Sequence, residues 1–145
     1  MIYQSRREEA AVLDQLESND KIIEQFGRQI LVPGINEEGQ LKLANRKVCI
    51  VGLGALGTIA SQYLVRSGIG EISLIDPDNI EESNLHRQIN YDQNDIGKSK
   101  AKISEKKLNN INNITKVQSY TETFENYIKL NKKYNFDLIF DCTDS

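Results

Sequence analysis

One glycine-rich hexapeptide limits the fold of this chain more than any other feature. Gly52-Leu-Gly-Ala-Leu-Gly57 matches the pattern G-x-G-x-x-G and directly follows the apolar run at 47–51. Glycine permits a tight turn and lets the backbone approach a phosphate closely, and a helix that begins at the turn adds N–H donors. The glycine loop (residues 52–57) therefore predicts a strand over 47–52, a phosphate-binding turn and a helix.

The remaining segments continue this alternation of strands and helices. Apolar runs predict strands at 71–76, 116–121 and 136–141, and helical periodicity predicts helices at 97–111 and 123–132. This order is typical of an α/β fold with a doubly wound, Rossmann-like parallel sheet and helices on both faces. Two helical faces are expected to be buried: Leu56, Ala60, Tyr63, Leu64 and Ser67 on the first, and Ala101, Ser104, Leu108 and Ile111 on the second.

The first 20 residues are expected to form a helical extension (1–20) that precedes a nucleotide-binding domain (21–145). A helix is predicted over 6–18, and Asp20 is a candidate cap for a second short helix. Because the chain stops just after a predicted strand, we expect the sheet to be truncated at its C-terminal end.

Charge and hydropathy exclude several classes of function. Residues 1–25 account for the whole net charge of −3, and the remainder is neutral, which gives no argument for binding DNA or RNA. The apolar stretches are too short to span a membrane, and the N-terminus does not resemble a secretory signal. We therefore expect a cytoplasmic protein with no nucleic-acid or membrane partner.

The spacing between the glycine loop and the next predicted strand does not decide which nucleotide binds. Asp76 ends a predicted strand 19 residues after Gly57, where a carboxylate can bind ribose hydroxyls, and this spacing also fits an NAD-dependent oxidoreductase. Arg87 and Lys100 add two cations near the loop, which suits a triphosphate better than a dinucleotide. Both ligands remain open on the residues alone.

Asp141 and Asp144 lie at the carboxyl end of the last predicted strand, where a carboxylate could hold Mg²⁺ or simply start a turn. His86, the only histidine, has no identifiable serine or cysteine nucleophile beside it. Cys49 and Cys142 form no CxxC pair and are expected to be small buried residues at or near strands.

Several motifs in a fixed order now resemble one family. They are Phe26-Gly-Arg-Gln-Ile-Leu, Val51-Gly-Leu-Gly-Ala-Leu-Gly57, Asp76-x-Asp78, Ser83-Asn-Leu-His-Arg-Gln88, Gly97-Lys-Ser-Lys100 and Asp141-Cys-Thr-Asp144. Together they resemble the ThiF/MoeB/HesA family, the bacterial relatives of ubiquitin-activating enzymes. The resemblance runs from about residue 21 to the end of the chain.

The resemblance implies an ATP- and Mg²⁺-dependent adenylyltransferase. Such an enzyme activates the C-terminal glycine of a ubiquitin-like sulfur-carrier protein as an acyl-adenylate, as in thiamine or molybdopterin biosynthesis, and is often a homodimer. The implied catalytic residues are Arg28, supplied by the neighbouring subunit, with Arg87, Lys100 and Asp144, the last on Mg²⁺. The implied nucleotide-binding residues are Gly52, Gly54, Ala55, Gly57, Asp76, Asp78, Ser83, Asn84, Arg87, Gln88 and Lys100.

Zn²⁺ is expected only in a C-terminal half that this sequence does not contain, and residues 1–145 alone are expected to be weakly active or inactive. Two alternatives stay open at this point. One is an NAD-dependent oxidoreductase domain, and the other is a nucleotide-binding module without catalytic activity.

Overall fold

The computed structural model describes residues 2–131 and 135–144. The chain divides into two compact units, Met1–Leu43 and Ala44–Ser145. In the first unit, helix α1 (Ile2–Gln25) is continuous, so the predicted break at Asp20 is wrong. The residues around Asp20 include no glycine or proline, so nothing there stops the helix. The domain boundary expected between residues 20 and 21 stays a prediction.

A second helix, α2 (Asn36–Ala44), was not predicted. Its start is explained by Asn36, whose side-chain oxygen accepts a hydrogen bond from the Gly39 N–H at 2.9 Å. Glu37 and Glu38 lie in the first turn, where negative charge is favoured. Residues 41–43 belong to this helix.

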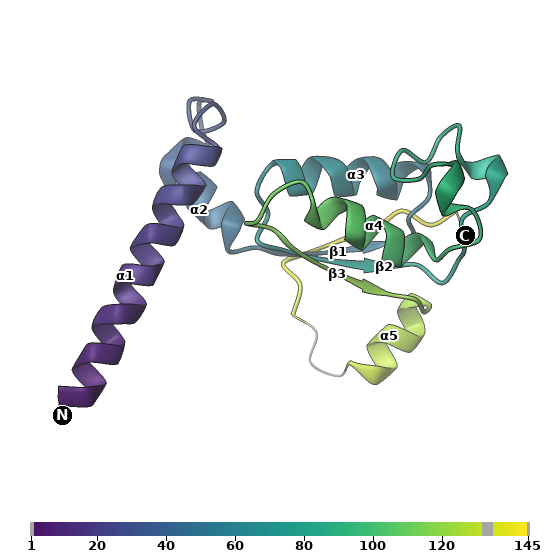
Figure 1. Ribbon diagram of the computed structural model, residues 1–145. Coiled ribbons are helices and arrows are strands. Elements are labelled where there is room, and N and C mark those ends of the chain that lie inside the picture. The colour runs from purple at the N-terminus through teal and green to yellow at the C-terminus, as the bar shows by residue number, and fades with distance from the viewer. Residues whose placement is uncertain (1, 132–134, 145) are drawn as a thin grey trace. The chain divides into compact units, whose positions relative to one another are not determined.

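The second unit holds a parallel sheet of four strands among the described residues (Figure 1). These are β1 (Lys47–Val51), β2 (Glu71–Ile75), β3 (Lys116–Tyr120) and β4 (Leu138–Asp141), in the order β3-β2-β1-β4. Each predicted strand is present, shortened by one or two residues. From β1 the chain builds the sheet outward in one direction through β2 and β3, and then returns to add β4 on the other side of β1. In open α/β sheets, ligands bind at such a switch point, outside the carboxyl ends of the strands.

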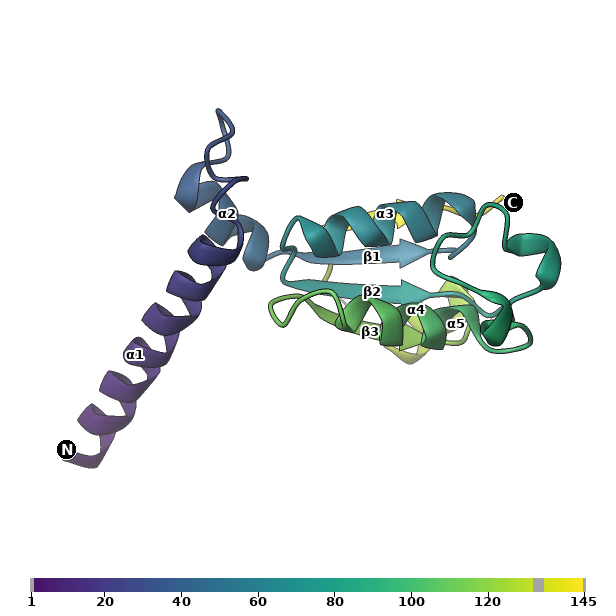
Figure 2. The same cartoon turned by 45° about the horizontal axis from the view of Figure 1, so that its top comes forward.

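Helices cover both faces of the sheet. Helices α3 (Ala55–Arg66) and α4 (Lys100–Asn109) lie on one face, and α5 (Phe124–Leu130) lies on the other, as the two views together show (Figures 1 and 2). Two short 3₁₀ turns, Glu82–Asn84 and Gln93–Asp95, interrupt the connection from β2 to α4. The predicted Rossmann-like α/β fold is confirmed. Residue 132, the predicted end of the α5 helix, lies outside the described residues.

Strand alternation divides the core into two halves. Cys49, Val51 and Ile75 point to the α5 side, where Tyr127 packs against them. The Tyr127 ring meets the Tyr120 ring edge-on, with centroids 4.7 Å apart. Burial raises the pKa of Cys49 to about 12, so this cysteine stays a neutral thiol, as its predicted core position implies.

The buried face of α3 differs from the predicted one. Leu56 and Tyr63 are 69% and 71% exposed, whereas Thr58, Ser61 and Val65 are fully buried. Small residues let the helix lie close to the sheet, and the Thr58 and Ser61 hydroxyls donate to carbonyls of their own helix turn, both at 2.8 Å. In α4 the expected residues Ala101, Ser104 and Leu108 are buried, but the helix covers 100–109 and not the predicted 97–111. Ile111 therefore lies beyond the helix end and is only partly buried.

Gly70, just before β2, is tightly packed against the backbone, so its substitution is expected to lower stability. A Cβ at this residue would overlap the backbone carbonyl oxygen of Ala44, which cannot move aside as a flexible side chain can. We expect Gly70→Ala to lower the free energy of unfolding by about 1–3 kcal/mol, measured by urea denaturation. Gly39→Ala is the control, because a Cβ there meets nothing closer than 3.7 Å. Equal stability of the two variants would contradict the packing described here.

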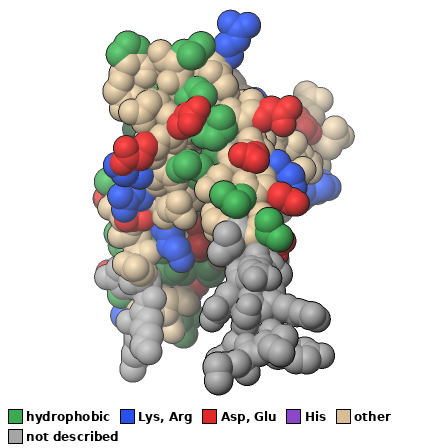
Figure 3. All heavy atoms as spheres, turned by 90° about the vertical axis from the view of Figure 1, so that its left-hand side faces the viewer, with side chains coloured by type: hydrophobic (Ala, Val, Ile, Leu, Met, Phe, Trp, Pro, Cys, Tyr) green, Lys and Arg blue, Asp and Glu red, His purple; other side chains and the backbone are tan. Residues whose placement is uncertain are grey.

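The molecular surface carries mixed charges. On the face shown in Figure 3, basic and acidic side chains are interspersed rather than gathered into a patch of one sign. Within residues 2–131 and 135–144, no helix combines the length and the apolar character that crossing a bilayer requires.

Candidate nucleotide-binding site

A cavity of about 950 Å³ opens at the carboxyl ends of the strands, where the strand order reverses. The glycine loop, the end of β2 and the segment after β4 form its wall, together with the first residues of α4 and α5. Its lining includes ten of the predicted site residues: Gly52, Gly54, Ala55, Asp76, Asp78, Asn84, Arg87, Gln88, Lys100 and Asp144.

Steric contacts explain the glycine loop. Gly52 has φ +86°, and a Cβ on it would come within 2.9 Å of the Cys142 carbonyl oxygen after β4. A Cβ on Gly57 would overlap the Gly52 carbonyl oxygen, so this glycine sets the close approach of α3 to the loop. Gly54 precedes the first residue of α3, and no side chain caps the helix there. The first N–H groups of α3 are therefore available to a ligand.

Asp76 is the main organiser of the loop. Its side chain is only 4% exposed, and one carboxylate oxygen accepts the Leu53 N–H at 2.6 Å while the other accepts the Asp78 N–H at 2.8 Å. Burial raises the pKa of Asp76, and the two backbone N–H groups and the nearby Lys100 ammonium oppose that shift. Asp76 thus ties the glycine loop to β2 while its carboxylate still faces the cavity.

Lys100 reaches the cavity from the first turn of α4. Ser99 caps this helix by accepting the Lys102 N–H, and the Lys100 N–H donates to the Asp78 carbonyl at 3.0 Å. The Lys100 ammonium lies 3.0 Å from an Asp78 carboxylate oxygen, and the lysine side chain is only 10% exposed. The solvated lysines of α4 therefore differ from Lys100, which is held at the cavity wall.

The connection after β2 supplies three further lining residues. Arg87 donates to the Ser83 carbonyl at 3.0 Å, and Asn84 is buried with its side-chain oxygen accepting the Glu81 N–H at 3.2 Å. Gln88 is 3% exposed, and its side-chain oxygen has no hydrogen-bond partner among the described residues. A buried acceptor of this kind is suited to a ligand donor or a water molecule.

The segment after β4 closes the opposite side. The Asp141 carboxylate accepts the Thr143 N–H at 3.1 Å and the Thr143 hydroxyl at 2.7 Å, and these bonds lower its pKa. Asp144 is exposed at the cavity wall. Cys142, which was predicted to be buried, is only partly buried because it lines the cavity after β4. In the described part of the chain, no three His, Cys, Asp or Glu side chains converge as a metal site.

Three predicted site residues lie elsewhere. Gly57, the last residue of the glycine loop, lies in α3 and outside the lining. Ser83 hydrogen-bonds Glu81 at 3.2 Å and is also outside the lining. Arg28 belongs to the first unit, so its role stays a prediction. His86 is exposed with a ring nitrogen 3.3 Å from the Arg87 guanidinium, as expected of a loop residue.

Sequence reasoning missed the start of α5 and Tyr91. Thr123, Phe124 and Glu125 line the cavity because the link from β3 to α5 is short. The available signal was Thr123, a helix-capping residue at the carboxyl end of a strand. Tyr91 hydrogen-bonds the glycine loop from behind.

The raised pKa of Asp76 predicts a pH dependence. As the pH falls through that pKa, the carboxylate takes up a proton and accepts the Leu53 and Asp78 N–H groups less strongly, so nucleotide affinity should fall. Stability changes in the opposite direction. Because the folded chain binds this proton more tightly than the unfolded chain, protonation of Asp76 adds to the free energy of unfolding. This contribution is greatest below the ordinary aspartate pKa, and it is lost as the pH rises through the raised pKa of the folded protein.

Titration of the nucleotide Kd between about pH 4 and pH 7 tests this prediction. The midpoint should lie above the ordinary aspartate value, and Asp76→Asn should remove this transition. A wild-type curve that Asp76→Asn leaves unchanged would show that another group titrates.

The parallel sheet, the glycine loop and the strand-end cavity together define a Rossmann-like α/β domain with a nucleotide-binding type of site. The chain belongs to the ThiF family, whose family model matches residues 26–145. The family predicted from the motifs is therefore confirmed, and the oxidoreductase alternative is not favoured.

Among curated proteins, the chain is 39% identical over 123 residues to the adenylyltransferase and sulfurtransferase MOCS3 of Dictyostelium discoideum. It is 36% identical over 125 residues to the sulfur carrier protein adenylyltransferase of Thermus thermophilus. Each alignment covers 85% of this chain, but only 29% and 45% of the respective relative. The chain thus spans less than half the length of these proteins.

Solved structures show the same relationship. E. coli tRNA N6-threonylcarbamoyladenosine dehydratase TcdA, solved with ATP, superposes with a TM-score of 0.78 at 28% identity, covering 87% of this chain and 51% of TcdA. E. coli MccB, solved with ATP, gives a TM-score of 0.62 at 39% identity, covering 68% of this chain and 29% of MccB. A further MccB structure, solved with AMPCPP and MccA, gives a TM-score of 0.65 at 38% identity, covering 71% of this chain and 31% of MccB.

Proposed function

We propose that this chain is the ATP-binding part of an adenylyltransferase that activates the C-terminal carboxylate of a ubiquitin-like sulfur-carrier protein. The observation that carries the proposal is the cavity itself. It joins an uncapped helix N-terminus at Ala55 with two cations, Arg87 and Lys100, and a strand-end carboxylate, Asp144. A relative named as a sulfur carrier protein adenylyltransferase supports the choice of substrate.

The reaction follows from this arrangement. The carrier carboxylate attacks the α-phosphorus of ATP, the bond to the pyrophosphate oxygen breaks, and an acyl-adenylate and pyrophosphate result. The step requires positioned reactants and neutralised charge more than a side-chain nucleophile. N–H groups at the start of α3 hold phosphate oxygens, and Arg87 and Lys100 stabilise the charge that builds up on the phosphates. In this proposal Asp76 would bind the ribose hydroxyls.

The charge of the lining favours a dependence on Mg²⁺. Among the residues that the structure describes, the cavity wall carries two cations against six carboxylates, a balance that would repel a bare triphosphate. The six are Asp76, Asp78, Glu122, Glu125, Asp141 and Asp144. A divalent cation between Asp144 and the phosphates offsets this repulsion, and its ligands would be oxygens, as Mg²⁺ prefers.

A second polypeptide completes the site in this proposal. Arg28 of a neighbouring copy would add a third cation, so the active form is a homodimer. The carrier protein would enter with its flexible C-terminus directed at the α-phosphate. Zn²⁺ would bind only outside these residues, and the reaction takes place in the cytoplasm.

Nucleotide choice is the experiment that tests the proposal. Isothermal titration calorimetry of the complete protein should show binding of ATP with Mg²⁺, weaker binding of ATP with EDTA, and no binding of NADH. Binding of NADH without any response to Mg-ATP would reject adenylation and restore the oxidoreductase alternative. Mg-ATP binding without carrier-dependent chemistry would instead support a binding module.

A further inference from the structure

Tyr91 is a buried tyrosine that lies behind the glycine loop and outside the cavity lining. Its side chain is 7% exposed, and its hydroxyl lies 3.0 Å from the Leu53 carbonyl oxygen and 3.4 Å from the Lys100 carbonyl oxygen. A phenol has a single proton to donate. Because the Leu53 carbonyl oxygen is closer than that of Lys100, we infer that the hydroxyl donates its proton to Leu53, which lies in the glycine loop.

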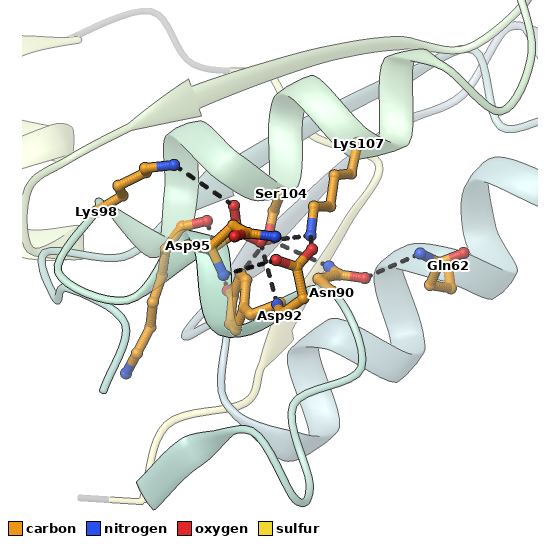
Figure 4. A network of polar contacts seen from close by, with 10 residues as sticks. Gln62, Asn90, Asp92, Asp95, Lys98, Ser104 and Lys107 are labelled. Atoms are coloured by element: carbon orange, nitrogen blue, oxygen red, sulfur yellow. Dashed lines mark hydrogen bonds and ion pairs between the residues drawn. The ribbon is translucent and has the colours of Figure 1, made fainter. Parts of the chain in front are cut away.

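A chain of hydrogen bonds orients the Tyr91 hydroxyl. The Asn90 amide donates to the Ser104 hydroxyl at 3.2 Å, and the Ser104 hydroxyl donates to the Tyr91 oxygen at 3.1 Å. Gln62 of α3 donates to the Asn90 oxygen at 2.9 Å, so Asn90 joins α3 to α4, as Figure 4 shows. Since Ser104 already donates to it, the Tyr91 oxygen directs its own proton to the loop.

A second network fixes the same segment from outside. Asp92 and Asp95 cap a 3₁₀ turn, and both form ion pairs with Lys107 of α4 (Figure 4). This holds residues 90–95 against α4. The position of Tyr91 is therefore set by the fold and does not require a nucleotide.

The hydrogen bond from the Tyr91 hydroxyl to the Leu53 carbonyl sets the direction of the Gly54 N–H at the cavity. In a trans peptide the C=O of one residue and the N–H of the next point in opposite directions. Since the Leu53 carbonyl points back to Tyr91, the Gly54 N–H points away from Tyr91. Gly54 lines the cavity, and its N–H has no acceptor within the described residues. The Leu53 N–H is itself held by Asp76 at 2.6 Å. Both peptide planes flanking Leu53 are thus fixed.

We propose that Tyr91 is a positioning residue of the nucleotide site, whose hydroxyl aims the Gly54 N–H at a phosphate oxygen of the bound nucleotide. The inference rests on the proposed function for the identity of the ligand. It assigns a role in phosphate binding to a residue that does not touch the ligand. Loss of the hydroxyl leaves the Leu53–Gly54 peptide free to rotate.

The test is Tyr91→Phe in the complete protein, which keeps the ring and removes only the hydroxyl. We expect the Kd for Mg-ATP to rise about fivefold to tenfold, as for the loss of one oriented hydrogen bond, while the Kd for adenosine, which has no phosphate, stays unchanged. Tyr127→Phe is the matched control, since Tyr127 is another buried tyrosine, 5% exposed and packed in the α5 core. It should change neither Kd.

A second measurement does not depend on the nucleotide. The Gly54 amide resonance of the ligand-free protein should shift in Tyr91→Phe and stay in place in Tyr127→Phe. Equal weakening of ATP and adenosine binding would show that Tyr91 serves stability alone and would overturn the inference, as would an unmoved Gly54 amide. If the wild-type protein bound no ATP, the proposed function would fail, and a shifted Gly54 amide would still support the positioning role.

Discussion

Replacing Lys100 by alanine is expected to lower the rate of adenylation by about 100-fold to 1000-fold while the fold stays intact. The Lys100 ammonium is held at the cavity wall by its ion pair with Asp78, and in the proposed reaction it would face the charge that develops on the phosphates. Removing one such preorganised contact typically raises the activation free energy by about 2.7–4 kcal/mol, which corresponds to this loss of rate. We expect Arg87→Ala, the other cation of the lining, to act in the same direction.

Carrier-dependent exchange of labelled pyrophosphate into ATP measures the effect of Lys100→Ala. Lys102→Ala is the matched control, because Lys102 lies on the same helix turn but is exposed and outside the cavity lining. Near-normal exchange in both Lys100→Ala and Arg87→Ala would show that the two cations do not act on the phosphates. Circular dichroism and thermal unfolding would check that each variant is folded.

Gly57→Ala is the second change with a large expected effect. The new Cβ would overlap the Gly52 carbonyl oxygen, so α3 and the glycine loop must move apart. We expect a loss of about 1–3 kcal/mol in the free energy of unfolding and a loss of about 100-fold in exchange rate, because displacement of the phosphate site by about 1 Å misplaces the reactants.

Gly70→Ala separates the two effects of Gly57→Ala. Its Cβ also overlaps a backbone carbonyl oxygen, that of Ala44, but Gly70 lies before β2, at the end of the strands away from the cavity. It should therefore lower stability and leave the Kd for Mg-ATP unchanged. If Gly70→Ala raised the Kd for Mg-ATP as much as Gly57→Ala does, Gly57→Ala would act only through general destabilisation.

The parallel sheet and the position of the cavity at its carboxyl edge could be predicted from the sequence because both depend on short-range patterns. The glycine loop, the strand before it and Asp76 at the end of β2 are close in sequence and have strong local signals. The cavity then follows from the rule that ligands bind at the carboxyl ends of parallel strands.

Side-chain burial could not be predicted in the same way. Periodicity favours Leu56 and Tyr63 for the core, but close packing of α3 on the sheet selects Thr58, Ser61 and Val65 instead. The difference depends on the distance between helix and sheet, which Gly57 sets. Tyr91 was missed because its role depends on a contact with Leu53, 38 residues earlier in the chain.

Carrier-dependent pyrophosphate exchange by the complete protein tests the central claim most directly. The proposal predicts exchange that requires Mg²⁺, ATP and a ubiquitin-like carrier with a free C-terminal glycine carboxylate. It also predicts that amidation of that carboxylate abolishes the exchange. Mg-ATP binding with no exchange in the presence of sulfur-carrier proteins, or exchange unaffected by amidation, would contradict the account.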